Sequence, residues 1–212
     1  MNKITDDFDA HFEVFKRVVK TAQMLDCRYI RMFSFYNEQK NSDWTSDDRE
    51  NVIAKLKKLI EYAEAEDVVL LHENEKDIYG DTINRCLDLM QELYCDNFKA
   101  VFDPANFVQC GQDTKEAFDT LKDYVEYMHI KDARFSDNAV TPAGLGDGNL
   151  PYIIGNLFNN GYDGYLSLEP HLGSFVGLAD LELDDTMEKL PQGGEATFTV
   201  AHKALCKVID EI

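Results

Sequence analysis

The sequence lacks long apolar runs and a secretory leader, and each absence excludes a class of protein. No apolar run approaches the roughly 20 residues that a membrane-spanning helix needs. The N-terminal stretch, MNKITDDFDAHFEVF, has neither the apolar core nor the small-residue cleavage site of a signal peptide, so secretion is not indicated. We therefore expect no membrane partner.

Paired cysteines are also lacking. The five cysteines are odd in number and widely spaced, at positions 27, 86, 95, 110 and 206. They form no CxxC zinc signature and suggest no disulfide framework. Reduced thiols are the simplest interpretation, and they predict a cytoplasmic location.

Basic residues are scarce. Only 21 Lys and Arg stand against 40 Asp and Glu, which gives a formal net charge of -19. Such a surface repels phosphate backbones, and the lysines at 55, 57 and 58 are interleaved with apolar residues on a helical segment. We therefore expect no nucleic-acid partner and a well-solvated surface.

What is present indicates one packed domain. The chain has 212 residues, of which 44% are hydrophobic, and this is enough for one sizeable core. No Pro-, Ser- or Gly-rich linker separates two halves. We predict a single domain over residues 1–212.

Helical and strand patterns alternate along this domain. Strands are expected at 28–35, 67–72, 98–102, 125–130, about 139–142, and 164–168. Helices are expected at 5–24, around the apolar positions 52–63, and at 81–93, 114–123, 150–159 and 197–212. Thr5 or Asp6 is the candidate N-cap of the first helix. Alternation of helices with strands that are apolar throughout is typical of a parallel sheet covered by helices.

The chain starts with a helix, which is unusual for a parallel β/α fold because no strand precedes that helix. A complete eight-stranded barrel needs about 250 residues. Six strand–helix units in this length fit either an open doubly wound sheet or a barrel without its first two strands.

Ligand-type side chains recur where the candidate strands end. The segment LLHENE places Glu73 at one strand end, and VFDPANF places Asp103 at the next. His129 lies in YMHIKD, and Glu169 lies in LSLEPHL. A single carboxylate there is usually a helix N-cap or a salt-bridge partner. Because sites in parallel β/α folds gather at the carboxyl ends of strands, the recurrence predicts one shared divalent-metal site.

The predicted ligand set consists of three carboxylates and one imidazole. Mostly oxygen ligands suit Mn²⁺, Mg²⁺ or Co²⁺ with open positions for substrate oxygens, more than a closed structural zinc site. We expect Mn²⁺, with Mg²⁺, Co²⁺ or Zn²⁺ as alternatives.

The order of these motifs resembles a known family. LLHENE, FDPANF, YMHIKD, GLGDGNLP and LSLEPHL together resemble the xylose-isomerase-like sugar isomerase/epimerase superfamily, which also contains endonuclease IV. The opening ITDDFDAHFEVFK…CRYIRMFSFY looks like the region that leads into the third barrel strand of that family. The resemblance covers nearly the whole chain. It implies an α/β TIM-barrel-like fold that is incomplete and N-terminally truncated, with about six of the eight β/α units.

The resemblance also implies a function. It is metal-dependent isomerisation or epimerisation of a small sugar or polyol, with Glu73, Asp103, His129 and Glu169 as metal ligands. Glu73 and Glu169 match the residues that also act as acid and base in related ketose epimerases. A metal that holds a carbonyl and its neighbouring hydroxyl stabilises an enediolate, and the carboxylates remove and return the proton. No phosphate-cradling glycine loop is evident, so an unphosphorylated substrate is preferred.

Further residues are assigned by strand position. Arg31, Lys131 and His171 are candidate substrate contacts. Arg31 could instead form a structural salt bridge at the barrel mouth, and Lys131 could pair with Asp132. Asn106 stands where some relatives have a histidine, so its role is open.

Three other functions are weighed against this one. An inosose-type dehydratase could use the same metal and carboxylates. A DNA-repair endonuclease needs more metal ligands and a basic face, which five histidines and the acidic charge disfavour. A non-catalytic relative could keep the metal residues and lack a working substrate pocket.

The strand that begins at Arg28 would be a sheet edge, which favours a homodimer or larger assembly.

Overall fold

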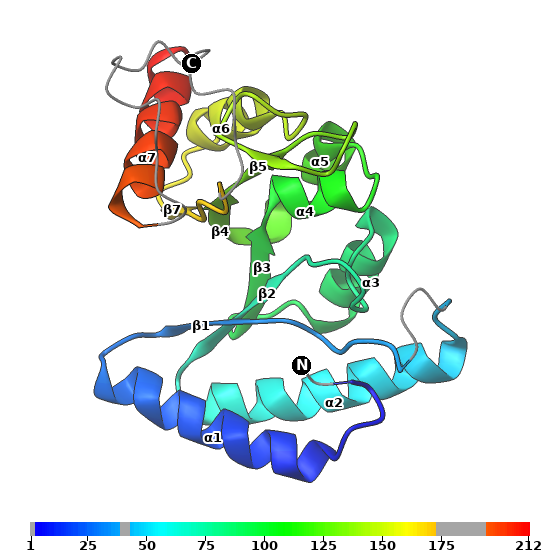
Figure 1. Ribbon diagram of the computed structural model, residues 1–212. Coiled ribbons are helices and arrows are strands. Elements are labelled where there is room, and N and C mark those ends of the chain that lie inside the picture. Colours follow the sequence, from blue (N-terminus) through cyan, green and yellow to red (C-terminus); the bar gives the residue numbers. More distant parts are fainter. Residues whose placement is uncertain (1–2, 39–42, 173–193) are drawn as a thin grey trace. The chain divides into compact units, whose positions relative to one another are not determined.

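The computed structural model describes residues 3–38, 43–172 and 194–212 (Figure 1). Two compact units make up the chain. The first unit contains residues 1–102 and 120–126, and the second contains 103–119 and 127–212. No helix in the described ranges is long and apolar enough to cross a membrane.

Five strands form one sheet, in the order β1-β2-β3-β4-β7. Their bounds are β1 Tyr29–Met32, β2 Val69–Glu73, β3 Phe98–Phe102, β4 Val125–Ile130 and β7 Tyr165–Leu168. The pairs β1–β2, β2–β3 and β4–β7 are parallel. The expected α/β fold with the parallel sheet of an incomplete TIM barrel is confirmed.

Helices of the first unit cover its strands with an apolar layer. They are α1 Phe8–Met24, α2 Ser46–Ala65 and α3 Ile83–Leu93. In Figure 1, α1 and α2 lie side by side, and α2 also contacts α3 and β2. The apolar positions that predicted α2 are buried, namely Val52, Leu56, Leu59 and Ala63. They join a core that includes Leu70 of β2 and Phe98 of β3.

The first helix begins later than predicted. Asp7, and neither Thr5 nor Asp6, is its N-cap, and the Asp7 side chain accepts hydrogen bonds from backbone N–H groups two and three residues further on. The Asp6 carboxylate instead accepts a hydrogen bond of 2.7 Å from the backbone N–H of Lys3. Adjacent residues with similar cap propensity therefore serve two different turns.

The second unit contains four α-helices and a short antiparallel ribbon in its described part. The helices are α4 Pro104–Gln109, α5 Thr114–Leu121, α6 Leu150–Asn159 and α7 Glu195–Asp210. Helix α7 contacts both α6 and β7 (Figure 1). The ribbon pairs β5 Asp132–Ala133 with β6 Val140–Thr141.

This ribbon corrects one prediction. The segment around 139–142 was expected to be a sixth strand of the parallel sheet, but β6 has only two residues and pairs antiparallel with β5. In the described part of the chain, the sheet therefore has five strands, and the segment around 139–142 is not one of them. A run of two residues is too short to distinguish a sheet strand from a hairpin by its sequence pattern.

His72 is fully buried inside the first unit. It lies on β2, and its side chain packs beside Phe98 and Gly80, where even a Cβ on the glycine would lie 2.7 Å from the imidazole. Its Nε2 has no hydrogen-bond partner within the part of the chain that the structure describes. Burial lowers the pKa of His72 from 6.5 to about 4.

The depressed pKa predicts that acid destabilises the fold through His72. Between about pH 6.5 and pH 4 the unfolded chain binds the proton and the folded chain does not, so the free energy of unfolding falls by up to about 3 kcal/mol. We expect His72→Leu to remove most of this dependence, measured by urea unfolding at pH 7 and pH 5. His202→Gln, at an exposed histidine of α7, should keep the wild-type dependence. An equal fall in His72→Leu and wild type would contradict the assignment.

Candidate metal centre

Each of the four predicted ligands lies at the carboxyl end of a parallel strand. Glu73 is the last residue of β2, and Asp103 directly follows β3 as the N-cap of α4. His129 is the penultimate residue of β4, and Glu169 directly follows β7. The strand ends were predicted within two residues, which is why these positions could be recognised from the sequence.

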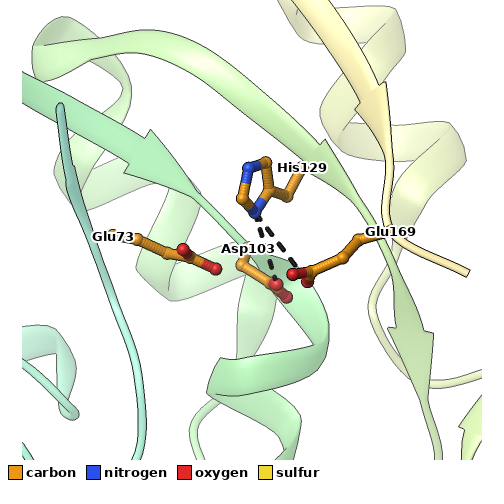
Figure 2. A group of neighbouring side chains, drawn as sticks. All are labelled: Glu73, Asp103, His129 and Glu169. Carbon is orange, nitrogen blue, oxygen red and sulfur yellow. Dashed lines mark ion pairs between the residues drawn. The ribbon is translucent and has the colours of Figure 1, made fainter. Parts of the chain in front are cut away.

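Three of the four side chains meet within the second unit. The Nδ1 atom of His129 lies 3.9 Å from Oδ2 of Asp103 and 3.9 Å from Oε2 of Glu169 (Figure 2). Each of the three side chains offers a ligand atom within 4.8 Å of the others. Atoms bonded to one ion at roughly 2.1 Å lie about 3–4 Å apart, so a group of this size and composition could hold a divalent metal.

Asp103 is both a helix cap and a candidate ligand. Its fully buried carboxylate accepts a hydrogen bond of 3.0 Å from the backbone N–H of Asn106 through Oδ1. Pro104 occupies the first turn of α4, where its missing N–H is not needed. This cap fixes the side chain so that Oδ2 lies toward His129, and it gives Asn106 a structural contribution through its backbone.

Lys131 lies among the same carboxylates. Its Nζ is 2.8 Å from Oδ2 of Asp103 and 2.7 Å from Oε2 of Glu169, and only 5% of its side chain is exposed. The suggested pair of Lys131 with Asp132 is therefore wrong. His129 and Lys131 are two residues apart in extended chain and share a face, whereas Asp132 lies on the other face.

These contacts shift two pKa values. Burial alone would lower the pKa of Lys131, but the charges of Asp103 and Glu169 and their hydrogen bonds raise it above its ordinary value. Burial likewise tends to raise the pKa of Glu169, and its hydrogen bond and ion pair with Lys131 lower it overall. Both groups are therefore charged at neutral pH.

Glu73 and Arg31 form an ion pair in the first unit. Arg31 lies on β1, and its Nε is 3.2 Å from Oε2 of Glu73, whose side chain is buried. The alternative of a salt bridge for Arg31 is confirmed. The guanidinium also lies over the ring of Phe33, 4.6 Å from its centroid.

His171 is the most exposed of the candidate site residues. Its Nε2 lies 4.0 Å from Oε1 of Glu169, and 63% of its side chain is accessible. The adjoining residues 173–193 lie outside the described chain.

Asp132 organises the loop next to these residues, and the sequence analysis, which considered it only as a partner of Lys131, missed this role. Its carboxylate accepts hydrogen bonds from the backbone N–H groups of Ala133, Gly144, Gly146 and Gly148, at 2.8 to 3.0 Å. A Cβ at Gly146 or Gly148 would collide with this carboxylate. The sequence did contain a signal for this role, namely the glycine-rich run GLGDG at 144–148 that follows Asp132. Glycines let a backbone approach a buried carboxylate closely.

Removing the Asp132 carboxylate should destabilise the protein strongly. In Asp132→Ala four backbone N–H groups lose their acceptor, and we expect the free energy of unfolding to fall by about 3 kcal/mol or more in urea unfolding. Asp119→Ala, at an exposed residue of α5, should cost less than about 1 kcal/mol. Equal losses in the two variants would show that the loop does not depend on Asp132.

The sequence was compared with known families. A family model described as a xylose isomerase-like TIM barrel matches residues 2–191. The chain belongs to this family. Its motif order, its parallel sheet and the candidate ligands at its strand ends agree with that membership.

Individual relatives of the chain are distant. A 3-dehydroshikimate dehydratase from Bacillus anthracis is 21% identical over 160 residues, which cover 72% of this chain and 56% of that protein. The structure of an L-ribulose 3-epimerase has a TM-score of 0.70 at 18% identity, covering 94% of this chain and 67% of that one. A xylose isomerase-like TIM barrel protein from Mycobacterium smegmatis, in complex with magnesium, has a TM-score of 0.63 at 15% identity, covering 92% of this chain and 64% of that one. Similarity at these identities establishes the fold, and the chain spans little more than half of its curated relative.

Proposed function

We propose that this protein is a metal-dependent isomerase or epimerase that moves a proton next to a carbonyl of a small sugar or polyol. The observation that carries the proposal is the group of Asp103, His129 and Glu169 at the carboxyl ends of β3, β4 and β7 (Figure 2). Family membership supports it, because relatives with this fold include sugar epimerases and a dehydratase.

Glu73 completes the proposed ligand set. Two features of the first unit support this role. Glu73 ends the parallel strand β2, and its side chain is almost fully buried, in contact with the Arg31 cation.

The donor set fits a hard divalent cation. Three carboxylates and one imidazole favour Mn²⁺, with Mg²⁺, Co²⁺ and Zn²⁺ as alternatives, and a relative of this fold was solved with magnesium. When bound, such an ion would polarise the substrate carbonyl and ease proton removal at the adjacent carbon.

The chain's own side chains would transfer the proton. Glu169 has a lowered pKa and is a carboxylate at neutral pH, as a general base must be. Glu73 would exchange a proton with the same carbon. Its ion pair with Arg31 would hold its carboxylate in place. We assign His171, Lys131 and Arg31 to contacts with substrate oxygens, where cationic or N–H donors are required.

A dehydratase is the second candidate, and the curated relative from Bacillus anthracis favours it. Dehydration begins with the same proton removal and continues with loss of a neighbouring hydroxyl as water. The two activities therefore share the residues named above and differ in the substrate bound.

Solvent isotope exchange tests both candidates at their common step. The protein would be loaded with Mn²⁺ in D₂O and incubated with a panel of ketoses, inososes and 3-dehydroshikimate. The products would be analysed by NMR and mass spectrometry. We expect deuterium at the carbon next to the carbonyl, with retention of oxygen for an epimerase or loss of water for a dehydratase. Absence of exchange with every member of the panel would favour a non-catalytic relative.

We also propose that the chain self-associates through the face beside β1. In the described residues of the first unit, β1 pairs with β2 on one side only. A groove of about 550 Å³ lies along β1 and α1, and Val14 and Val18 on its border are 46% and 43% exposed. An apolar surface beside an open strand edge favours contact with a second copy.

Charged substitutions at this face should therefore convert the oligomer into a monomer. We expect the double variant Val14→Lys and Val18→Lys to sediment as a monomer while the wild type sediments as a dimer or larger. Phe158→Lys, at an exposed apolar residue of α6, should leave the wild-type state unchanged. Identical sedimentation of all three proteins would remove this face as the interface.

A further inference from the structure

We infer that Lys131 is a built-in cation that occupies the metal-binding carboxylates in the metal-free protein and competes with the incoming ion. The inference rests on the proposed function, because it concerns the same site. It assigns to this lysine an effect on metal affinity that is separate from any contact with substrate.

The geometry places the ammonium on the oxygens that a metal would need. Lys131 Nζ contacts Oδ2 of Asp103 at 2.8 Å and Oε2 of Glu169 at 2.7 Å. These are the same two oxygens that lie 3.9 Å from Nδ1 of His129. An ion bound to His129 and both carboxylates must therefore share or take over these contacts.

Burial makes this competition strong. Only 5% of the Lys131 side chain is exposed, so its charge interacts with its neighbours through little water. A buried ammonium is tolerated when it is paired, and the two carboxylates provide that pairing. The two carboxylates in turn lie close together, with ligand atoms within 4.8 Å, and would repel each other without a cation.

Two opposite consequences follow for the metal-free and metal-bound states. Without metal, Lys131 neutralises Asp103 and Glu169 and stabilises the folded chain. With metal, a divalent ion beside the ammonium meets like-charge repulsion, so part of the binding free energy is lost in displacing it. The flexible four-carbon stem of lysine allows this displacement, and the released ammonium is then free to contact a substrate oxygen.

Calorimetric titration with Mn²⁺ and thermal unfolding test the inference without an activity assay. Lys131→Met removes the charge and keeps an unbranched side chain. We expect it to bind Mn²⁺ at least tenfold more tightly than wild type, to unfold at a lower temperature without metal, and to gain more from added Mn²⁺. Lys131→Gln, which keeps a hydrogen-bond donor, should change in the same direction if Lys131→Met does not fold.

Two matched variants separate charge from general effects. Lys131→Arg keeps the positive charge and should show no gain in affinity. Lys99→Met removes a partly buried lysine that pairs with Glu126 at 3.0 Å, away from the ligand set, and should leave Mn²⁺ affinity unchanged.

The outcomes distinguish this inference from the proposed function. Equal or weaker Mn²⁺ binding by folded Lys131→Met and Lys131→Gln, with binding intact in wild type, would overturn the inference and leave the metal site standing. Binding by neither wild type nor these variants would overturn both. Binding by Lys131→Met with none in wild type would support the inference in its strongest form, in which the lysine replaces the metal.

Discussion

Asp103→Asn is expected to weaken Mn²⁺ binding by about a hundredfold or more and to reduce turnover to background. Asparagine is also a good N-cap, so it can accept the Asn106 N–H as the aspartate does and preserve the start of α4. With that cap kept, the amide oxygen stays on the Asn106 N–H and the amide nitrogen, which cannot bind a metal, replaces Oδ2 beside His129. Lys131 keeps Glu169 as its ion-pair partner, so the change is confined to the proposed centre. Loss of a supporting residue already costs metal sites 10- to 100-fold, and a ligand contributes at least as much.

Calorimetric titration with Mn²⁺ measures this loss directly. Circular dichroism and urea unfolding of the metal-free variant would show that the fold is retained. Asp119→Asn, an exposed aspartate on α5, is the matched control and should bind Mn²⁺ as the wild type does. Wild-type affinity in Asp103→Asn would mean that this carboxylate is only a helix cap.

Glu169→Gln is expected to lower turnover about a thousandfold while it reduces Mn²⁺ affinity far less than Asp103→Asn does. The amide oxygen of glutamine can still coordinate a metal, but the side chain cannot accept a proton at neutral pH. A positioned general base contributes typically 10²- to 10⁴-fold to a rate. Deuterium exchange between D₂O and the carbon next to the substrate carbonyl measures the lost step.

The control for this variant is the same Glu-to-Gln substitution at a different position. Glu116→Gln, on the exposed side of α5, makes the same substitution away from the ligand set and should exchange deuterium at the wild-type rate. If metal-loaded Glu169→Gln also exchanged at the wild-type rate, Glu169 would be a ligand without a role as base.

Much of the site could be predicted because its residues are tied to strand ends. The strands at 98–102 and 125–130 have the bounds that their apolar, β-branched and aromatic composition indicated. Strand β2 runs to Glu73 itself, one residue beyond the expected end. Parallel pairing then places the following side chains on one edge of the sheet, so local patterns alone indicated Asp103 and His129 as neighbours.

What could not be predicted depends on contacts between residues distant in sequence. The ribbon of β5 and β6 forms where the Asp132 carboxylate binds the backbone of Gly144, Gly146 and Gly148, and no local period records those bonds. The short helix α4, Pro104–Gln109, was also missed, because six residues show too little periodicity to be recognised.

The ion-pair partners of Lys131 were not predicted from the sequence. Its neighbour in sequence, Asp132, was considered as a partner, yet adjacent residues of an extended chain point to opposite faces. The two-residue spacing from His129 already placed Lys131 on the ligand side. Which carboxylates it would reach depends on tertiary packing, and the structure shows them to be Asp103 and Glu169.

Anomalous X-ray diffraction from crystals grown with Mn²⁺ tests the central claim most directly. The account predicts one strong peak bonded to Asp103, His129 and Glu169, with Glu73 as the fourth protein ligand. It also predicts that Lys131 Nζ then lies more than 2.8 Å from Asp103 Oδ2. A structure with no anomalous peak at these side chains, or with Mn²⁺ bound elsewhere on the chain, would contradict the account.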